Sequence, residues 1–493
     1  MITTPTSARP SSGVDASSGS GSQPRVPALP HRAALAVVLV GVFLTGLDFF
    51  IVNVAIPSMQ ADLRASEAQI QLIVASYALA YGVGLITGGR LGDLYGRRRT
   101  FILGMIVFTF ASAACGVATG PGFLLVARLV QGLAAALMVP QVLAILSTVY
   151  SGEARARAIN WYAATAGIAA VFGQLIGGIL IREDLFGLGW RACFLINLPI
   201  GLAAALLAGR YVPESRAPGR HRLDLIGMVL VTLALVGICL PLIEGRAQGW
   251  PLWVWPCLLA GGLLLTVFVR QQRWRGANGG TPSMDMALFR ERAFTAGLVA
   301  QLTFFASMAS YFLVLALYLQ QGRHLDPLDS GLVFGVLGLG YIITSMTARK
   351  VAARLGRQTI AIGCLIRILA LVLQIWAVAK IGTSGSVGWL VPGLFLDGAG
   401  MGLAIAPLAA TVLARVSADN AGAASGVLGT AQQVGNALGV ALVGLVFYDV
   451  LSRGGGADRA YPDAFTACLY CVLGISVLLA FVVQTLPKAP GRR

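Results

Sequence analysis

Apolar runs of about 20 residues recur along almost the whole chain, and each is long enough to cross a bilayer core as a helix. Short segments with arginine, glycine and proline separate the runs. The pattern predicts an all-α polytopic membrane protein with about 14 transmembrane helices. The predicted helices are 33–56, 70–89, 101–119, 122–149, 158–181, 191–210, 225–244, 251–269, 294–319, 329–349, 358–379, 387–413, 422–448 and 464–486.

The two chain ends have a different composition. Residues 1–32 are rich in Ser, Pro and Gly and contain no apolar core, so they are predicted to be a disordered tail and not a signal peptide. The first helix is then the insertion signal. Residues 488–493 form a second short tail.

Composition and charge agree with a membrane protein. Of the 493 residues, 57% are hydrophobic and 11% are charged, whereas soluble domains have about a quarter of their residues charged. An even number of helices puts both termini on one side, and arginine clusters such as Arg97–Arg99 fall between helices on that side. The positive-inside rule then predicts cytoplasmic termini in a multi-pass inner (cytoplasmic) membrane protein. The net charge of +16 therefore requires no nucleic acid partner.

Two sequence similarities indicate an internal repeat. "LGDLYGRRR" (91–99) matches "VAARLGRQT" (351–359), and "GQLIG" (173–177) matches "GNALG" (435–439). Both pairs are separated by about 260 residues, a mark of transporters built from repeats. The chain is therefore predicted to fold into two six-helix bundles, 33–211 and 294–487, with a two-helix insertion and its basic linkers at 212–293.

Two charges interrupt the apolar runs of the first half. Asp48 stands in "TGLDFFIVNVAIP", and Arg128 stands in "RLVQGLAAALMVP". A carboxylate at the bilayer centre costs roughly 3 kcal/mol on insertion scales, so ionisable residues there are functional candidates. The alternative for Arg128 is that it reaches the interface from a helix end. Gln131 follows one turn later, and Gly132 with its alanines permits close helix packing.

A third motif, "GRLGDLYGRRRT", follows the second helix. An aspartate at a helix end with arginines in reach can hold two helices together in one conformation and release them in another. The alternative is an ordinary basic loop. The predicted latch consists of Gly89, Asp93, Gly96, Arg97 and Arg98.

The fifth and twelfth helices carry further candidates. The glycine face of "GQLIGG" (Gly173, Gly177 and Gly178) suits helix packing and a moving hinge, and Gln174 places an amide in the bundle. Asp397 matches Gln131 in the repeat, so we expect it to face the cavity from the opposite half, as a partner of a cationic substrate or a second proton site. The alternative is a lone carboxylate near an outer helix end. The predicted substrate-cavity residues are Asn53, Gln131, Gln174 and Asp397.

These motifs together resemble the major facilitator superfamily, and within it the 14-span drug:proton antiporters. "GRLGDLYGRRRT" is similar to the loop motif of the superfamily, "RLVQG" to the motif linked to proton coupling, and "LDFFIVNVAIP" and "GWRACFLINLPIG" to stretches of the 14-span branch. The antiporter motif usually reads G-P-x-x-G-G, and here Gln174 replaces the proline.

The resemblance implies proton-driven export of lipophilic or cationic drugs or antibiotics by alternating access of the two halves. The first and fourth helices line the same half-bundle in this superfamily, so Asp48 is expected to be a proton-titrated group facing the central cavity, with Arg128 nearby. Burial and a neighbouring cation act in opposite directions on the proton affinity of a carboxyl group. The sequence has no P-loop, so the proton gradient is the expected energy source, with no cofactor or metal.

Three alternatives remain open. One is a dedicated exporter of a single secondary metabolite made by the same cell. Another is an uptake carrier for a small organic solute, which usually needs a denser polar lining. The last is a membrane enzyme or receptor, which would need a catalytic cluster or an extramembrane domain. We expect a monomeric, non-enzymatic transporter whose partners are the substrate, protons and the lipid bilayer.

Overall fold

The computed structural model describes residues 28–216, 224–278, 289–381, 385–413, 421–453 and 457–486. These residues form helices joined by short turns, and they include no strand. Fourteen of the described helical segments are long and apolar enough to cross a membrane. The predicted all-α polytopic fold with about 14 spans is therefore confirmed.

The helices fall into three groups along the chain. The first group is α1 (Ala28–Leu63), α2 (Glu67–Tyr95), α3 (Arg97–Gly116), α4 (Pro121–Val149), α5 (Gly152–Glu183), the 3₁₀ turns η1 (Leu185–Gly187) and η2 (Gly189–Arg191), α6 (Ala192–Leu195) and α7 (Asn197–Tyr211). The second is α8 (Leu225–Ala247) and α9 (Val254–Ala277). The third is α10 (Arg292–Leu317), the π-helical turn η4 (Tyr318–Gly322), α11 (Pro327–Leu355), α12 (Gln358–Ile381), the 3₁₀ turn η5 (Val387–Leu390), α13 (Val391–Leu413), α14 (Ala421–Arg453) and α15 (Ala457–Thr485).

Two boundaries differ from the sequence prediction. Helix α1 begins at Ala28, inside the predicted tail 1–32, and its Pro30 lies in the first turn, where proline is tolerated. The rest of that tail and the tail 488–493 lie outside the described residues. The predicted helix 191–210 is divided into η2, α6 and α7. Pro199 has no amide hydrogen to donate to the carbonyl four residues earlier, which accounts for the break before α7.

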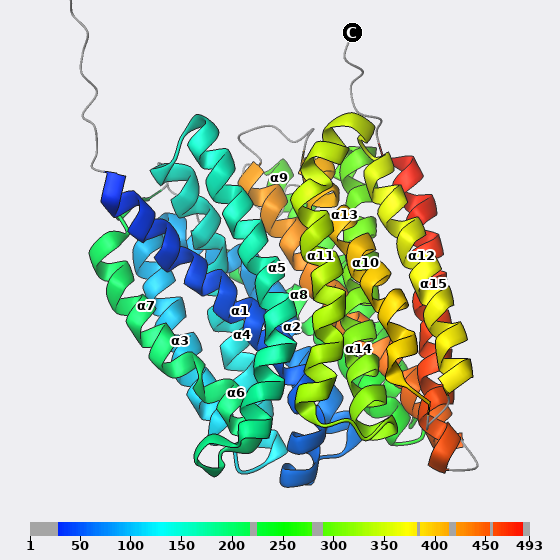
Figure 1. Cartoon of the computed structure of the whole chain (residues 1–493). Coiled ribbons are helices and arrows are strands. Elements are labelled where there is room, and N and C mark those ends of the chain that lie inside the picture. The colour runs from blue at the N-terminus through cyan, green and yellow to red at the C-terminus, as the bar shows by residue number, and fades with distance from the viewer. Residues whose placement is uncertain are drawn as a thin grey trace, which may run out of the picture.

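The first and third groups stand side by side (Figure 1). Helix α1 begins and α15 ends at the same end of the molecule, which we call the terminal end; the opposite end is the distal end (Figure 1). The two groups meet mainly where α5 packs against α11 and where α2 packs against α14. The cavity described below lies between them.

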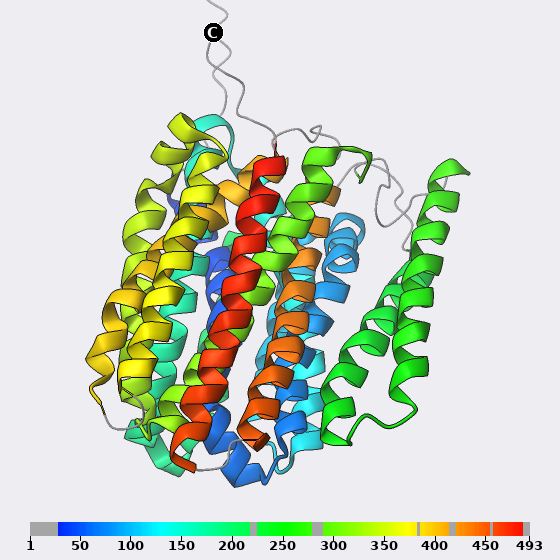
Figure 2. The same cartoon turned by 90° about the vertical axis from the view of Figure 1, so that its right-hand side faces the viewer.

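The insertion lies outside both groups. Helices α8 and α9 pack against each other at one edge of the molecule, and α8 also contacts α2 and α14 (Figure 2). Its linker residues 217–223 and 279–288 lie outside the described residues, so the predicted domain bounds 212–293 stay a prediction.

Close packing of α2 and α4 positions the buried charges. A Cβ atom at Gly132 would collide with the carbonyl oxygen of Tyr77 on α2 and would lie 3.0 Å from the Cβ of Ala80. Only a glycine lets the two backbones approach this closely. Arg128, one turn earlier on α4, is thereby held between α1 and α2.

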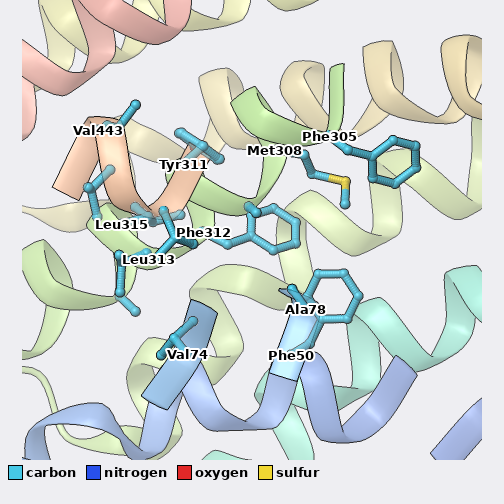
Figure 3. Close-up of a cluster of buried hydrophobic side chains, with 14 of the residues drawn as sticks. Phe50, Val74, Ala78, Phe305, Met308, Tyr311, Phe312, Leu313, Leu315 and Val443 are labelled. Atoms are coloured by element: carbon cyan, nitrogen blue, oxygen red, sulfur yellow. The ribbon is translucent and has the colours of Figure 1, made fainter. Parts of the chain in front are cut away.

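An aromatic cluster joins the two halves. The ring of Phe312 on α10 lies 5.3 Å from that of Phe50 on α1 and 5.7 Å from that of Phe334 on α11. Figure 3 shows Phe312 and Met308 pointing toward Phe50 and Ala78. Phe50, Met308, Phe312 and Phe334 all line the cavity between the halves.

Candidate functional site

Asp48 is fully buried within the first group of helices, at 0% exposure. Its Oδ2 accepts a hydrogen bond from Nη1 of Arg128, and its Oδ1 accepts one of 2.7 Å from Nε2 of Gln131. The same Nη1 of Arg128 donates to Oε1 of Gln131 at 2.9 Å. Arg128 and Gln131 are three residues apart on α4, so they share one helix face. The structure therefore brings together the Asp48, Arg128 and Gln131 singled out in the sequence.

Asn197 and Ser112 extend this network, and the sequence reasoning did not assign either of them. Nδ2 of Asn197 donates to Oδ1 of Asp48 at 3.3 Å and to Oγ of Ser112 at 2.9 Å, and Ser112 donates to the carbonyl of Phe194 at 2.9 Å. The sequence feature that could have indicated Asn197 is its position as a polar residue within the apolar stretch "FLINLPIG". Both oxygens of Asp48 thus have donors, an arrangement that suits an ionised carboxylate.

Tyr77 separates this network from the space between the halves. The guanidinium of Arg128 lies 4.3 Å from the centre of the Tyr77 ring, and the Tyr77 hydroxyl donates to the carbonyl of Thr45 at 3.2 Å. Tyr77 and Thr45 both line the cavity. The buried ion pair therefore lies directly behind one cavity wall.

A second buried ion pair occupies the third group of helices. Nε of Arg367 on α12 donates to Oδ1 of Asp397 on α13 at 2.9 Å, and the two residues are 1% and 0% exposed. Nearby, the hydroxyl of Tyr311 on α10 donates to Oε1 of Gln374 at 2.6 Å. Asp397 is thus paired with an arginine of its own half.

The cavity between the halves has a volume of about 300 Å³. This is at the small end of the range for small-molecule sites. Its wall is mostly apolar, and helices of both halves contribute to it. The contributing helices are α1, α2, α4 and α5 from one half and α10, α11, α13 and α14 from the other.

The four predicted cavity residues do not line this cavity. Gln131 faces Asp48, and Asp397 faces Arg367, because each forms polar contacts inside its own half. Asn53 is buried on α1, and Gln174 is buried on α5 with both amide atoms lacking a hydrogen-bond partner among the described residues. Asp48 itself lies behind Tyr77. The expected positions of these residues therefore differ from those in the structure, while their roles stay predictions.

The glycines of α5 serve two interfaces. Cβ atoms added at Gly173 and Gly177 would lie 2.9 Å from Phe50 Cβ and 2.7 Å from Ile51 on α1. One at Gly178 would collide with the carbonyl of Pro327 on α11. The glycine face therefore contacts α1 within its half and α11 across the halves, at the distal end.

The predicted latch forms contacts within one half. Nε and Nη2 of Arg97 donate to Oδ1 of Asp93 at 3.2 and 2.9 Å. The backbone amide of Arg98 donates to Oε1 of Glu214, which follows α7, at 3.1 Å. Gly96 has φ +111°, and a Cβ there would lie 2.7 Å from the same carboxylate. Gly89, one turn before Asp93, has Pro140 of α4 3.7 Å from its Cβ position. The sequence reasoning missed Glu214.

Comparison with known proteins identifies the family. The family model described as Major Facilitator Superfamily matches residues 38–440. The chain belongs to the major facilitator superfamily. It is accordingly a multi-pass membrane transport protein.

Relatives within the superfamily carry names connected with antibiotics. The chain is 39% identical to the probable actinorhodin transporter of Streptomyces coelicolor, over 88% of this chain and 76% of that protein. It is 35% identical to the puromycin resistance protein pur8 of Streptomyces alboniger, over 92% and 88% of the two chains. It is 34% identical to the cephamycin export protein CmcT of Amycolatopsis lactamdurans, over 90% and 91%. The resemblance to drug and antibiotic exporters of the superfamily is therefore confirmed.

Solved structures of the superfamily share the fold. A POT family transporter superposes with a TM-score of 0.67 at 15% identity, over 92% of this chain and 96% of that one. A bacterial homologue of the lysosomal transporter Spinster superposes with a TM-score of 0.66 at 16% identity, over 94% and 100%. At such identities the likeness supports the fold alone.

Proposed function

We propose that this chain exports lipophilic small molecules of the drug or antibiotic class across the inner membrane in exchange for protons. The supporting observation is the buried Asp48, held by Arg128, Gln131 and Asn197 directly behind the cavity wall. A titratable group with that placement senses both the proton and the occupancy of the cavity. The name of the cephamycin export relative supports export as the direction.

Asp48 is the proposed proton carrier. While ionised it forms the ion pair with Arg128; protonation removes that attraction and leaves the guanidinium with Gln131 and the Tyr77 ring. Since Tyr77 also lines the cavity, a change in the pair is transmitted to the cavity wall. No cofactor takes part and no covalent chemistry occurs.

Alternating access is the proposed transport cycle. In this conformation the halves are joined at the distal end, where Nε2 of Gln321 donates to Oε1 of Gln60 at 3.2 Å and Arg182 lies 3.6 Å from Asp326. With both termini in the cytoplasm, as the basic loops favour, the distal end is extracytoplasmic. This form would then receive substrate from the cytoplasm, and the monomer in the bilayer is the proposed transporting unit.

A proton-exchange experiment tests the proposal. In proteoliposomes holding an acidic interior, adding a transported drug should release protons and dequench a pH-sensitive dye. Asp48→Asn should abolish this release while protein incorporation stays unchanged. Asp449→Asn is the matched control, because Asp449 forms a surface pair with Arg453 and lies far along α14. Undiminished release from Asp48→Asn would reject Asp48 as the carrier.

A second candidate is a dedicated exporter of one metabolite made by the producing cell. The names of the actinorhodin and cephamycin relatives favour it. A panel of unrelated lipophilic drugs separates the two: a dedicated exporter should raise resistance to one structural class, and a general pump to several.

A further inference from the structure

The side-chain amides among the described cavity-lining residues all lie on α10 and α14. Nε2 of Gln301 lies 3.5 Å from Oε1 of Gln432, and Nδ2 of Asn436 donates to Oε1 of Gln433 at 3.0 Å. All four side chains line the cavity, and Gln301, Gln433 and Asn436 are 4%, 7% and 3% exposed. We call these four residues the amide cluster.

The amide cluster has unused hydrogen-bonding capacity. Oε1 of Gln301 and Oδ1 of Asn436 are buried and have no hydrogen-bond partner among the described residues. A side-chain amide carries two donor hydrogens and an acceptor oxygen, and the hydrogen bond to Gln433 uses one of the two N–H groups of Asn436. The cluster can therefore accept from a substrate hydroxyl and donate to a substrate carbonyl. Buried polar atoms of this kind normally have a partner, and a bound molecule is one way to supply it.

The other walls of the cavity suit aromatic rings. Phe49, Phe50, Phe305, Phe312 and Phe334 all line it. Aromatic side chains contribute large apolar area and favour stacked or edge-on ring contacts. The cavity thus offers side-chain amides on one side and mainly aromatic and aliphatic surface on the others, with tyrosine hydroxyls among the aromatic residues.

The described lining residues include no Asp, Glu, Lys, Arg or His. The two nearby ion pairs are each closed: Asp48 with Arg128 behind Tyr77, and Asp397 with Arg367, whose guanidinium lies 5.4 Å from the Phe304 ring. Each pair sums to zero charge, so neither gives the cavity a net negative field. Protonation of Asp48 would leave the positive charge of Arg128 uncompensated. A permanent cation in this cavity would therefore lack a counter-charge in either state.

From this arrangement we infer that the substrate is an uncharged aromatic compound bearing carbonyl or hydroxyl groups, recognised by the amide cluster. This inference rests on the proposed export function and names the substrate class of the same cavity. The sequence expectation of cationic substrates rested on Asp397 facing the cavity, and Asp397 instead pairs with Arg367. The apolar walls would select for lipophilicity, and the amides for neutral acceptors and donors.

Two compounds of similar shape test the inference by binding. Triphenylphosphine oxide is neutral with one strong acceptor oxygen, and tetraphenylphosphonium is a permanent cation. Binding to the full-length protein in nanodiscs, followed by tryptophan fluorescence, should give a dissociation constant about tenfold lower for the oxide. Equal or tighter binding of the cation by the unsubstituted protein would overturn the inference.

Variants separate recognition from folding. Gln433→Leu should weaken binding of the oxide about tenfold, since one amide contact is lost, whereas Gln358→Leu on the exposed end of α12 should not change it. Gln433→Glu should reverse the preference and favour the cation, because it adds the missing counter-charge. Failure of this reversal in a folded variant would contradict the inference. If the oxide binds as expected but a proton gradient does not drive its transport in proteoliposomes, the proposed export function is rejected while the inference about recognition stands.

Discussion

At the scale of single residues, the two buried ion pairs differ in how well they are satisfied. Asp48 accepts from Arg128, Gln131 and Asn197. Asp397 accepts only from Nε of Arg367, and its Oδ2 and both Nη atoms of Arg367 have no partner among the described residues. The first pair is therefore the better preorganised for an ionised carboxylate.

Removing one member of the first pair should be costly. Asp48→Leu leaves Arg128 as an uncompensated buried charge, with an expected loss of about 3–5 kcal/mol of stability. Asp48→Leu combined with Arg128→Met should recover part of that loss without restoring transport. Thermal denaturation of the detergent-purified variants measures both effects. Asp449→Leu, which breaks an exposed pair, should cost only about 0–1 kcal/mol; a similar cost at the two sites would contradict the buried-pair assignment.

The second pair should matter for stability more than for charge selection. Asp397→Ala strands Arg367 inside the third group of helices, so resistance to every exported compound should fall by the same factor, and the loss should follow the amount of folded protein. Asp397→Leu with Arg367→Leu should restore folded protein. A loss confined to cationic compounds in growth assays would favour the earlier idea of a substrate-cation partner.

Sequence reasoning located the charged residues of the network but not its full composition. Asp48 and Arg128 are detectable because a charge within an apolar run is costly and conspicuous. Asn197 and Ser112 were missed because neutral polar residues are common in helices, and only the packing of α3 and α7 brings them to Asp48. Asp397 was expected in the cavity from repeat alignment, which gives a helix position and cannot give the direction in which Arg367 draws the side chain.

At the scale of helices, glycines determine how closely the halves approach. Gly178 on α5 lies against Pro327 on α11, and Gly331 on α11 would place a Cβ 2.8 Å from the carbonyl of Gln174 on α5. The glycine motif was recognisable in the sequence as a packing face, but its contact with α11 depended on the arrangement of the two halves. The halves are closed together at the distal end largely through these backbone contacts.

A larger residue at Gly178 should therefore force the distal ends apart. Gly178→Val should destabilise the closed form by about 1–3 kcal/mol through overpacking. The measurement is the yield of a cross-link between Gln60→Cys and Gln321→Cys. In the unsubstituted protein the side chains of Gln60 and Gln321 lie 3.2 Å apart. The seven native cysteines are replaced by alanine in all variants, so that only the introduced pair can react. The yield should fall at least threefold. Gly335→Val on α11, where nothing lies within 4 Å, is the matched control; an equal fall there would refute the contact argument.

The loop between α2 and α3 is the other element expected to depend on conformation. Its described contacts, Asp93 with Arg97 and Arg98 with Glu214, stay within the first half in this closed-distal form. Asp93→Asn should remove charge-assisted hydrogen bonds worth roughly 1.5–3 kcal/mol each and lower export about tenfold. Ala353→Asn, the equivalent position in the second half, should change little. Efflux assays at matched expression decide this; equal defects in the two variants, or no defect in Asp93→Asn, would reject a latch that depends on the carboxylate of Asp93.

At the scale of the whole molecule, an uncharged substrate has a consequence for energetics. Each exchange of a neutral molecule for a proton moves one positive charge inward, so the membrane potential drives export together with the pH gradient. A potential of 100 mV is worth about 2.3 kcal/mol per charge, or a factor of about 50 in the accumulation ratio.

This predicts electrogenic transport. In proteoliposomes without a pH gradient, valinomycin can impose a potassium diffusion potential that makes the interior positive, the opposite of a respiring cell's cytoplasm. This potential alone should change the flux of triphenylphosphine oxide. Asp48→Asn should remove the dependence on the potential. A flux of the unsubstituted protein that does not respond to the potential would contradict neutral substrate–proton exchange.

Among the described residues, Tyr77 is the single ring that belongs to both the cavity wall and the surroundings of the buried ion pair. Apart from that ring, the residues that line the cavity and those that hold Asp48 are different sets. Heritable changes in the lining can therefore alter which antibiotic is recognised while the machinery that uses the proton is left intact. Such a division lets a lineage acquire resistance to a new compound by single substitutions, without passing through an uncoupled and leaky ancestor.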